Sequence, residues 1–242
     1  MIYENKFGKI NFWDAQKNPI LTSITDVVIP LSGGMDSSLS LYMMIQALIK
    51  KKLHIRIHTY SLILIYDKLS PKKEENFIAY EKTIQKVLEY FKNRYSHINL
   101  HHNIYKIQLN QNIDKYNILV SIRNNYRRLI PNILPIVAAL KGPPSDTNIN
   151  PIDTCKNYRI KGCVSDFNNP KTMIHLPFGM CDKRFIYKVY IDEKLDELLK
   201  ITRSCARPLN FDTYSMEPCG TCFGCKEREW ASRIVRKELN DI

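Results

Sequence analysis

A short glycine turn between an apolar run and a helix-like segment constrains the fold more than any other part of the chain. Residues 32–38 read Ser-Gly-Gly-Met-Asp-Ser-Ser. Apolar residues fill positions 27–31 before the turn and recur at helical spacing over residues 39–49 after it. This order predicts a buried strand, a tight turn and a helix start. Because glycines let backbone amides approach an anion and a helix N-terminus carries partial positive charge, the turn is suited to phosphate.

Two other interpretations of the turn are a P-loop and an ordinary capped turn without a ligand. It is not the P-loop of kinases and GTPases, because no lysine follows Gly34 at the required place. An ordinary Gly-Gly turn capped by Asp36 or Ser37 is the second alternative. The strand before the turn and the helix after it favour the phosphate-binding interpretation.

Four cysteines cluster in the last part of the sequence. Cys205, Cys219, Cys222 and Cys225 have the spacing C-x13-C-x2-C-x2-C. Four thiolates complete a tetrahedral structural zinc site, whereas closely spaced cysteines also bind iron–sulfur clusters. The upstream position of Cys205 and the lack of a Cys-Pro pair favour zinc. Buried free thiols and disulfides are weaker alternatives, since disulfides among seven cysteines would leave one unpaired.

Strand-like and helix-like segments alternate along the chain. Strands are expected at residues 26–31, 54–65, 98–109 and 173–176, and helices at 37–51, 72–95, 124–139, 183–190, 193–201 and 226–239. Such alternation predicts an α/β fold with a Rossmann-like parallel sheet and helices on both faces. The glycine turn would then lie at the carboxyl edge of the sheet, where ligands bind in such folds. We expect a polar N-terminal arm at residues 1–25, an α/β domain at 26–200, and a helical zinc-binding appendage at 201–242.

The glycine turn resembles the Ser-Gly-Gly-x-Asp-Ser signature of the N-type ATP pyrophosphatases, which cleave ATP between its α- and β-phosphates and have an adenine nucleotide alpha hydrolase-like fold. Residues 204–205 (Ser-Cys) and 219–228 (Cys-Gly-Thr-Cys-Phe-Gly-Cys-Lys-Glu-Arg) resemble the zinc-binding tail of the 7-cyano-7-deazaguanine synthases. Residues 122–124 are similar to the Arg-Asn element of that family, and residues 176–177 with 182–183 to its Pro-Leu…Lys segment. The chain thus resembles a divergent member of the synthase family.

The resemblance implies an activity and a set of site residues. In that family a carboxy-deazaguanine is adenylated with ATP, converted by ammonia to an amide, and then dehydrated to the nitrile with a second ATP. The resemblance places Asp36 near the phosphates and their Mg²⁺, and has Lys183 and Arg123 add positive charge there. The residues that would bind pyrophosphate are Ser32, Gly33, Gly34, Ser37 and Ser38. The implied cofactors are ATP, Mg²⁺ and, at the four cysteines, Zn²⁺.

One departure from the family concerns the base pocket. The family carries a Gly-Tyr-Pro-Asp-Cys-type stretch, whereas residues 151–155 here read Pro-Ile-Asp-Thr-Cys. Asp153 and Cys155 are the candidate remnants of that stretch, and a changed pocket would favour a changed substrate. Relatives in bacterial antiviral systems use the same chemistry on other acceptors. The expected amine is therefore either ammonia or an amine of a macromolecule.

The charge of the chain favours a different class of enzyme. A formal net charge of +12 could attract a nucleic acid, as in adenylating enzymes that modify tRNA, such as thiolases or lysidine-forming ligases. Direct nucleic-acid binding is not favoured, because no stripe of basic residues interleaved with aromatics stands out. A third alternative is a non-catalytic subunit, which the intact Asp36 and serines disfavour. No membrane span or export signal is visible, so we expect a cytoplasmic protein, with a second copy or a defence-system protein as its candidate partners.

Overall fold

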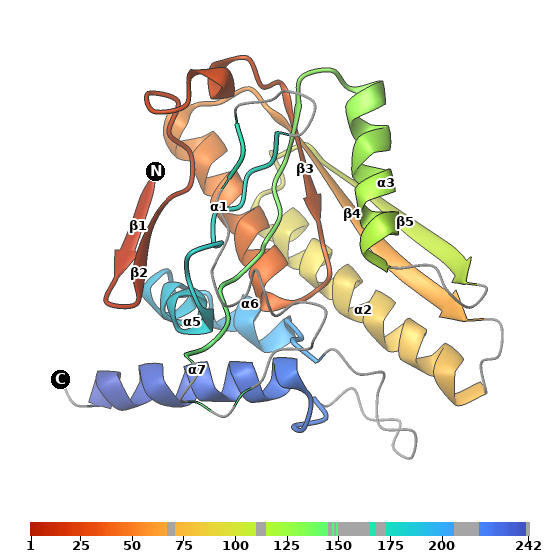
Figure 1. Cartoon of the computed structure of the whole chain (residues 1–242), viewed down its shortest axis with the longest axis vertical. Coiled ribbons are helices and arrows are strands. Elements are labelled where there is room, and N and C mark those ends of the chain that lie inside the picture. Colours follow the sequence, from red (N-terminus) through yellow and green to blue (C-terminus); the bar gives the residue numbers. More distant parts are fainter. Residues whose placement is uncertain are drawn as a thin grey trace.

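A four-stranded parallel sheet forms the centre of the computed structural model (Figure 1), which describes residues 1–66, 71–109, 115–144, 147, 149, 165–167, 173–205 and 218–240. The strand order is β5-β4-β3-β6, and all three neighbouring pairs are parallel. The strands are β3 (Asp26–Pro30), β4 (Arg56–Tyr66), β5 (Leu100–Leu109) and β6 (Ile133–Pro135). The helices between them are α1 (Met35–Lys51), α2 (Pro71–Arg94) and α3 (Lys115–Leu129).

The remaining elements come from the two ends of the chain. A hairpin of β1 (Ile2–Asn5) and β2 (Gly8–Asn11) is followed by the 3-10 helix η1 (Pro19–Thr22). After β6 come α5 (Lys183–Asp192), α6 (Asp196–Ile201) and α7 (Phe223–Asn240). In Figure 1, α7 lies along the side of the molecule toward which β3 points, with α5 and α6 between it and the N-terminal hairpin and α1. Within the described residues, no helix combines the length and apolarity needed to cross a membrane.

Helices cover both faces of the sheet. Because consecutive strand residues point to opposite faces, Val27 and Ile29 pack into the main core with α1 and α2. Val28 and Tyr60 point the other way and pack against Ile122 of α3. The α/β class with a parallel sheet and helices on both faces, expected from the alternating pattern, is confirmed.

The helix expected over residues 124–139 is wrong. The helix in this region, α3, spans Lys115–Leu129, and β6 lies where the second half of the expected helix would be. Pro131 has no amide hydrogen to donate and disfavours helical geometry at Ile130, so the helix ends before it. The next apolar residues, Ile133 and Leu134, extend and pair in parallel with β3 instead.

The N-terminal residues, expected to form a polar arm, contribute to the core. Phe12 and Trp13 are fully buried, and the Asn5 side chain donates a hydrogen bond to the Phe185 carbonyl of α5 at 3.4 Å. The strand expected at residues 173–176 is reduced to two single-residue bridges, which involve Ile174 and His175. The boundaries proposed at residues 25/26 and 200/201 stay predictions.

His175 joins three parts of the chain through its two ring nitrogens. Nε2 lies 2.7 Å from the Phe12 carbonyl, which can only accept, so this nitrogen carries the proton. Nδ1 then accepts from the Ser165 hydroxyl at 2.9 Å, and Ser165 Oγ accepts from the Leu176 amide at 2.8 Å. Burial lowers the pKa of His175 from 6.5 to about 4. The neutral ring is therefore the form that fits the fold.

This histidine makes the fold sensitive to acid. Between pH 6.5 and about 4 the unfolded chain binds a proton at His175 that the folded chain does not, so stability rises with pH in this window and is lost as pH falls through it. We compare the unfolding free energy of the wild type with that of His175→Gln. As the pH is lowered from 6.5 to about 4, we expect the wild-type value to fall by about 3 kcal/mol relative to that of the variant. Urea unfolding at a series of pH values measures it. The exposed control His54→Gln should follow the wild type, and a pH-independent difference for His175→Gln would contradict the prediction.

Candidate functional site

The glycine turn links β3 to α1 through backbone that only glycine fits easily. Gly33 has a φ of +68°, and a Cβ there would lie 3.0 Å from Cγ2 of Thr83. Gly34 is the N-cap residue of α1, and a Cβ there would lie 3.2 Å from the carbonyl oxygen of Arg203. The positive φ of Gly33 favours glycine at that position, and a side chain at either glycine would crowd a neighbouring residue.

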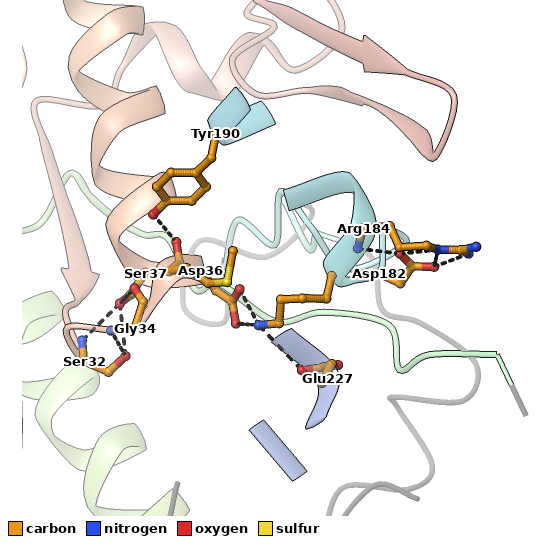
Figure 2. Close-up of polar contacts among 10 residues, drawn as sticks. Ser32, Gly34, Asp36, Ser37, Asp182, Arg184, Tyr190 and Glu227 are labelled. Atoms are coloured by element: carbon orange, nitrogen blue, oxygen red, sulfur yellow. Dashed lines mark hydrogen bonds and ion pairs between the residues drawn. The ribbon is translucent and has the colours of Figure 1, made fainter. Parts of the chain in front are cut away.

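The serines of the turn hold its shape through a local hydrogen-bond network (Figure 2). Ser37 Oγ donates to the Gly34 carbonyl at 3.2 Å and lies 3.0 Å from Ser32 Oγ. It also accepts from the Ser32 amide at 3.1 Å, and Ser32 Oγ accepts from the Gly34 amide at 3.3 Å. Ser38 is fully buried, and its hydroxyl has no hydrogen-bond partner among the described residues. The first turn of α1 thus holds a buried hydroxyl whose hydrogen-bonding capacity is unused.

The position of the turn in the sheet is typical of a ligand site. From β3 the chain first continues to its neighbour β4 and then to β5, and it later returns to β6 on the other side of β3. The turn follows β3 at its carboxyl end, beside this change of direction. In open α/β sheets the crevice at such a switch point is where ligands bind.

An ion-pair network brings Asp36 and Lys183 together at the turn. Lys183 Nζ lies 2.6 Å from Oδ1 and 2.5 Å from Oδ2 of Asp36, and 3.6 Å from Oε2 of Glu227. The side chains of Lys183 and Glu227 are only 3% and 2% exposed, whereas that of Asp36 is 24% exposed. Asp36 therefore faces the solvent side of a buried network of two carboxylates and one ammonium group (Figure 2).

Lys183 is held in place because both ends of α5 are fixed. Asp182 caps the helix by accepting from the Arg184 amide at 2.9 Å. Farther along α5, the Tyr190 hydroxyl donates to the Met35 carbonyl at the start of α1 at 2.8 Å. Burial, and then the nearby carboxylate of Asp36, hold the pKa of Tyr190 well above its usual range, so this hydroxyl keeps its proton. The first residue of α5 is thereby fixed against the first turn of α1.

Arg123 has no hydrogen bond or ion pair with Asp36 or Lys183 among the described residues. It is half-buried on α3, and its Nε is buried without a hydrogen-bond partner among the described residues. Its positive charge acts on the Tyr60 phenol of β4. Hydrogen bonds and ion pairs of the described residues join Asp36 to Lys183, and they do not join Arg123 to either residue. The structure thus joins Asp36 of the turn to Lys183, and a role for Arg123 at the phosphates stays a prediction.

The four cysteines converge on one point and form a candidate metal centre. Their sulfur atoms all lie within 4.8 Å of one another. The Sγ–Sγ distances are 3.5 Å for Cys205 and Cys219, 3.8 Å for Cys205 and Cys222, and 3.9 Å for Cys219 and Cys225. Sulfurs bound to one tetrahedral zinc at about 2.3 Å would stand about 3.8 Å apart. The cluster therefore has the dimensions of a site for a single tetrahedral metal ion.

Two residues near these cysteines contact the glycine turn and Lys183. The Arg203 amide, two residues before Cys205, donates to the Gly33 carbonyl at 2.9 Å. Glu227, two residues after Cys225, approaches Lys183. Sequence analysis singled out neither Arg203 nor Glu227. Their nearness to the cysteines is visible in the sequence. The contacts of Arg203 with Gly33 and of Glu227 with Lys183 depend on how the C-terminal segment packs against α1 and α5.

Arg228 connects α7 to the end of α6. Its guanidinium group donates to the carbonyls of Thr202 and Leu199, each at 2.6 Å. Thr202 immediately precedes Arg203, which contacts the turn. Arg228 therefore links the segment that leads to Cys205 with the helix that carries Cys225. The base-pocket candidates Asp153 and Cys155 lie outside the described residues.

Comparison with known proteins gives no family for this chain. No family model matches it, and no curated protein matches it. Among solved structures, it is similar to a protein of the universal stress protein family from Burkholderia pseudomallei, with 14% identity, a TM-score of 0.37, and coverage of 49% of this chain and 83% of that one. It is also similar to the U34-tRNA thiolase NcsA from Methanococcus maripaludis with its [4Fe-4S] cluster, with 12% identity, a TM-score of 0.46, and coverage of 87% and 72%. Neither similarity bears on the activity of this chain.

Proposed function

We propose that this chain uses ATP to adenylate a carboxylate, releasing pyrophosphate, and then transfers the activated acyl group to an amine. One observation carries the proposal: Asp36 and Lys183 meet beside a glycine turn at the switch point of a parallel sheet. This arrangement combines backbone amides, a helix N-terminus and an ammonium group, all of which stabilise phosphate charge.

The residues of the turn suit the first half of the reaction. A carboxylate oxygen would attack the α-phosphorus while the bond from that phosphorus to the bridging oxygen breaks, and pyrophosphate would depart. The amides and hydroxyls of residues 32–38, with Lys183, would bind the negative charge that develops on the leaving group. The carboxylate of Asp36 would hold Mg²⁺, which screens the phosphate charges.

In the second half of the reaction, an amine attacks the activated carbonyl carbon. AMP then leaves with the electrons of the broken carbon–oxygen bond, the amine loses a proton, and an amide forms. The resemblance to the cyano-deazaguanine synthases supports a deazaguanine carboxylate as the acceptor, with ammonia or a macromolecular amine as the nucleophile. The changed stretch at residues 151–155 is where a different acceptor would be accommodated.

At the cysteine cluster we propose a structural zinc ion. The sulfur–sulfur distances support a single ion, since in a four-iron cluster each thiolate binds a different iron and the sulfurs must stand farther apart. Four thiolates leave no open position on zinc for chemistry. A reducing compartment such as the cytoplasm would keep these thiols available to the metal.

The assay that tests the function follows both products. Metal-replete protein is incubated with ATP, Mg²⁺ and carboxy-deazaguanine, with and without ammonia, and AMP and the base are followed by mass spectrometry. We expect AMP, with an amide or nitrile when ammonia is present. AMP with a base–protein or base–nucleic acid adduct would identify a macromolecular amine. Absence of AMP would contradict the deazaguanine acceptor.

A tRNA-modifying adenylating enzyme is the second candidate, favoured by the net charge of +12. It would share the adenylation step but take a nucleoside of tRNA as the acceptor. In the thiolase type, iron would be bound in place of zinc. Elemental analysis of the purified protein separates these two assignments, because a thiolase-type cluster gives iron and sulfide and a structural site gives zinc alone.

A further inference from the structure

Glu227 is a buried carboxylate of α7, the helix that carries Cys225, and it approaches Lys183 beside the glycine turn. It lies in the first turns of α7, and its side chain is 2% exposed. Its Oε2 lies 3.6 Å from Nζ of Lys183. The three residues come from three helices: Asp36 from α1, Lys183 from α5 and Glu227 from α7. Lys183 therefore lies between one carboxylate from α1 and one from α7 (Figure 2).

Two carboxylates lie beside the ammonium group of Lys183, and the guanidinium group of Arg228 also attracts Asp36. Of these groups on the glycine-turn side, the carboxylate of Asp36 is more exposed than that of Glu227. A cation arriving with the nucleotide would meet Asp36 first. Lys183 would then exchange Asp36 for the phosphates, and the buried carboxylate of Glu227 would hold its ammonium group at the turn both before and after the exchange.

We infer that Glu227 is a positioning residue, which holds the ammonium group of Lys183 at the glycine turn while Lys183 exchanges Asp36 for the phosphates of Mg·ATP. The inference rests on the proposed function. It also gives the cysteine cluster a role at the nucleotide, because Glu227 is two residues from Cys225. An ion held by the cysteines would fix the start of α7, and α7 in turn carries the carboxylate that contacts Lys183.

The test compares the affinity for Mg·ATP of a set of variants with that of the wild type, by calorimetry. Glu227→Gln removes the charge that holds Lys183 at the turn when Asp36 is exchanged for the phosphates, so we expect the Kd to rise about tenfold. Glu227→Asp keeps the charge but withdraws it by one methylene, and should give a Kd about threefold above the wild type. The exposed Glu229→Gln on the same helix is the matched control and should bind as the wild type does.

A double-mutant cycle separates positioning from general support of the fold. In a Lys183→Met background, Glu227→Gln should change the Kd by less than about twofold, because its partner is already gone. Metal content and unfolding midpoint are measured for every variant, and Glu227→Gln should retain its metal. Should Glu227→Gln fail to fold, Glu227→Asp carries the test.

Three outcomes overturn the inference. The first is a Kd for Mg·ATP in Glu227→Gln equal to that of the wild type; if that variant does not fold, the same result in Glu227→Asp counts. The second is that Glu227→Gln lowers the affinity for Mg·ATP equally whether residue 183 is lysine or methionine. The third is a wild-type chain that does not bind Mg·ATP, which would overturn the proposed function itself and is recognised without any variant. The first two leave ATP binding by the wild type intact, so they refute only the role of Glu227.

Discussion

Replacing Asp36 by alanine is expected to abolish ATP-dependent AMP release, with a loss of at least about a hundredfold relative to the wild type. Asp36 contacts Lys183 through both carboxylate oxygens and is the most exposed carboxylate of the network at the turn. Its removal takes away the proposed ligand of Mg²⁺ and also the group that aims Lys183 at the turn. The measurement is AMP formed per folded protein in the assay with carboxy-deazaguanine.

Asp36→Ala takes away the carboxylate nearest to the buried Lys183 and leaves Glu227 beside it, so the variant could lose stability as well as activity. Controls must separate these two effects. Asp36→Asn keeps the volume of the side chain and removes the charge, so it should be as inactive as Asp36→Ala. Asp192→Ala removes an exposed aspartate of α5, whose ion pair with Lys188 is peripheral, and should keep full activity. A folded Asp36→Ala that releases AMP at the wild-type rate would refute the assignment, whereas its inactivity beside an active wild type rules out a non-catalytic subunit.

The second large effect is expected at the cysteine cluster. Cys222→Ser replaces one of four thiolates with a hydroxyl, and the bound metal should fall from about one ion per chain to near zero. Because metal binding supplies folding free energy directly, the unfolding midpoint should fall as well, with loss of structure in α7. The contacts of Arg203 with Gly33 and of Glu227 with Lys183 should weaken together, so the affinity for Mg·ATP should fall too.

Elemental analysis, thermal unfolding and calorimetry measure the three parts of this result. Cys181→Ala is the matched control, because Cys181 is a buried thiol outside the cluster. It removes a sulfur without removing a ligand, so its metal content should equal that of the wild type. Full metal retention and an unchanged unfolding midpoint in Cys222→Ser would refute a structural metal site.

The sequence was most informative where the signal is local. The glycine turn and the four cysteines were identified because their residues are close in sequence, so spacing alone brings them together. The strand at 26–31 and the helix at 37–51 were predicted within a residue or two of β3 and α1, because glycines mark their junction. Lys183 was found through its resemblance to a family segment, since an isolated lysine among 36 basic residues has no signal of its own.

Sequence reasoning failed where tertiary packing decides the outcome. Ile133 and Leu134 form a short apolar run whose pattern fits a helix as well as a buried strand, and only pairing with β3 selects the strand. Phe12 and Trp13 are surrounded by polar residues, so their burial depends on the core that forms around them. Glu227 has the same limitation, because its role depends on α7 crossing near α5 and α1.

The origin of the site in distant parts of the chain has a consequence for biosynthesis. Asp36 and Lys183 are 147 residues apart, and Glu227 is farther still from the turn. During translation the glycine turn therefore leaves the ribosome long before the residues that complete it, and contacts of such sequence separation form late in folding. On the proposed function, nucleotide affinity would arise in one late step, and ATP would stabilise finished chains over nascent ones by binding the assembled state.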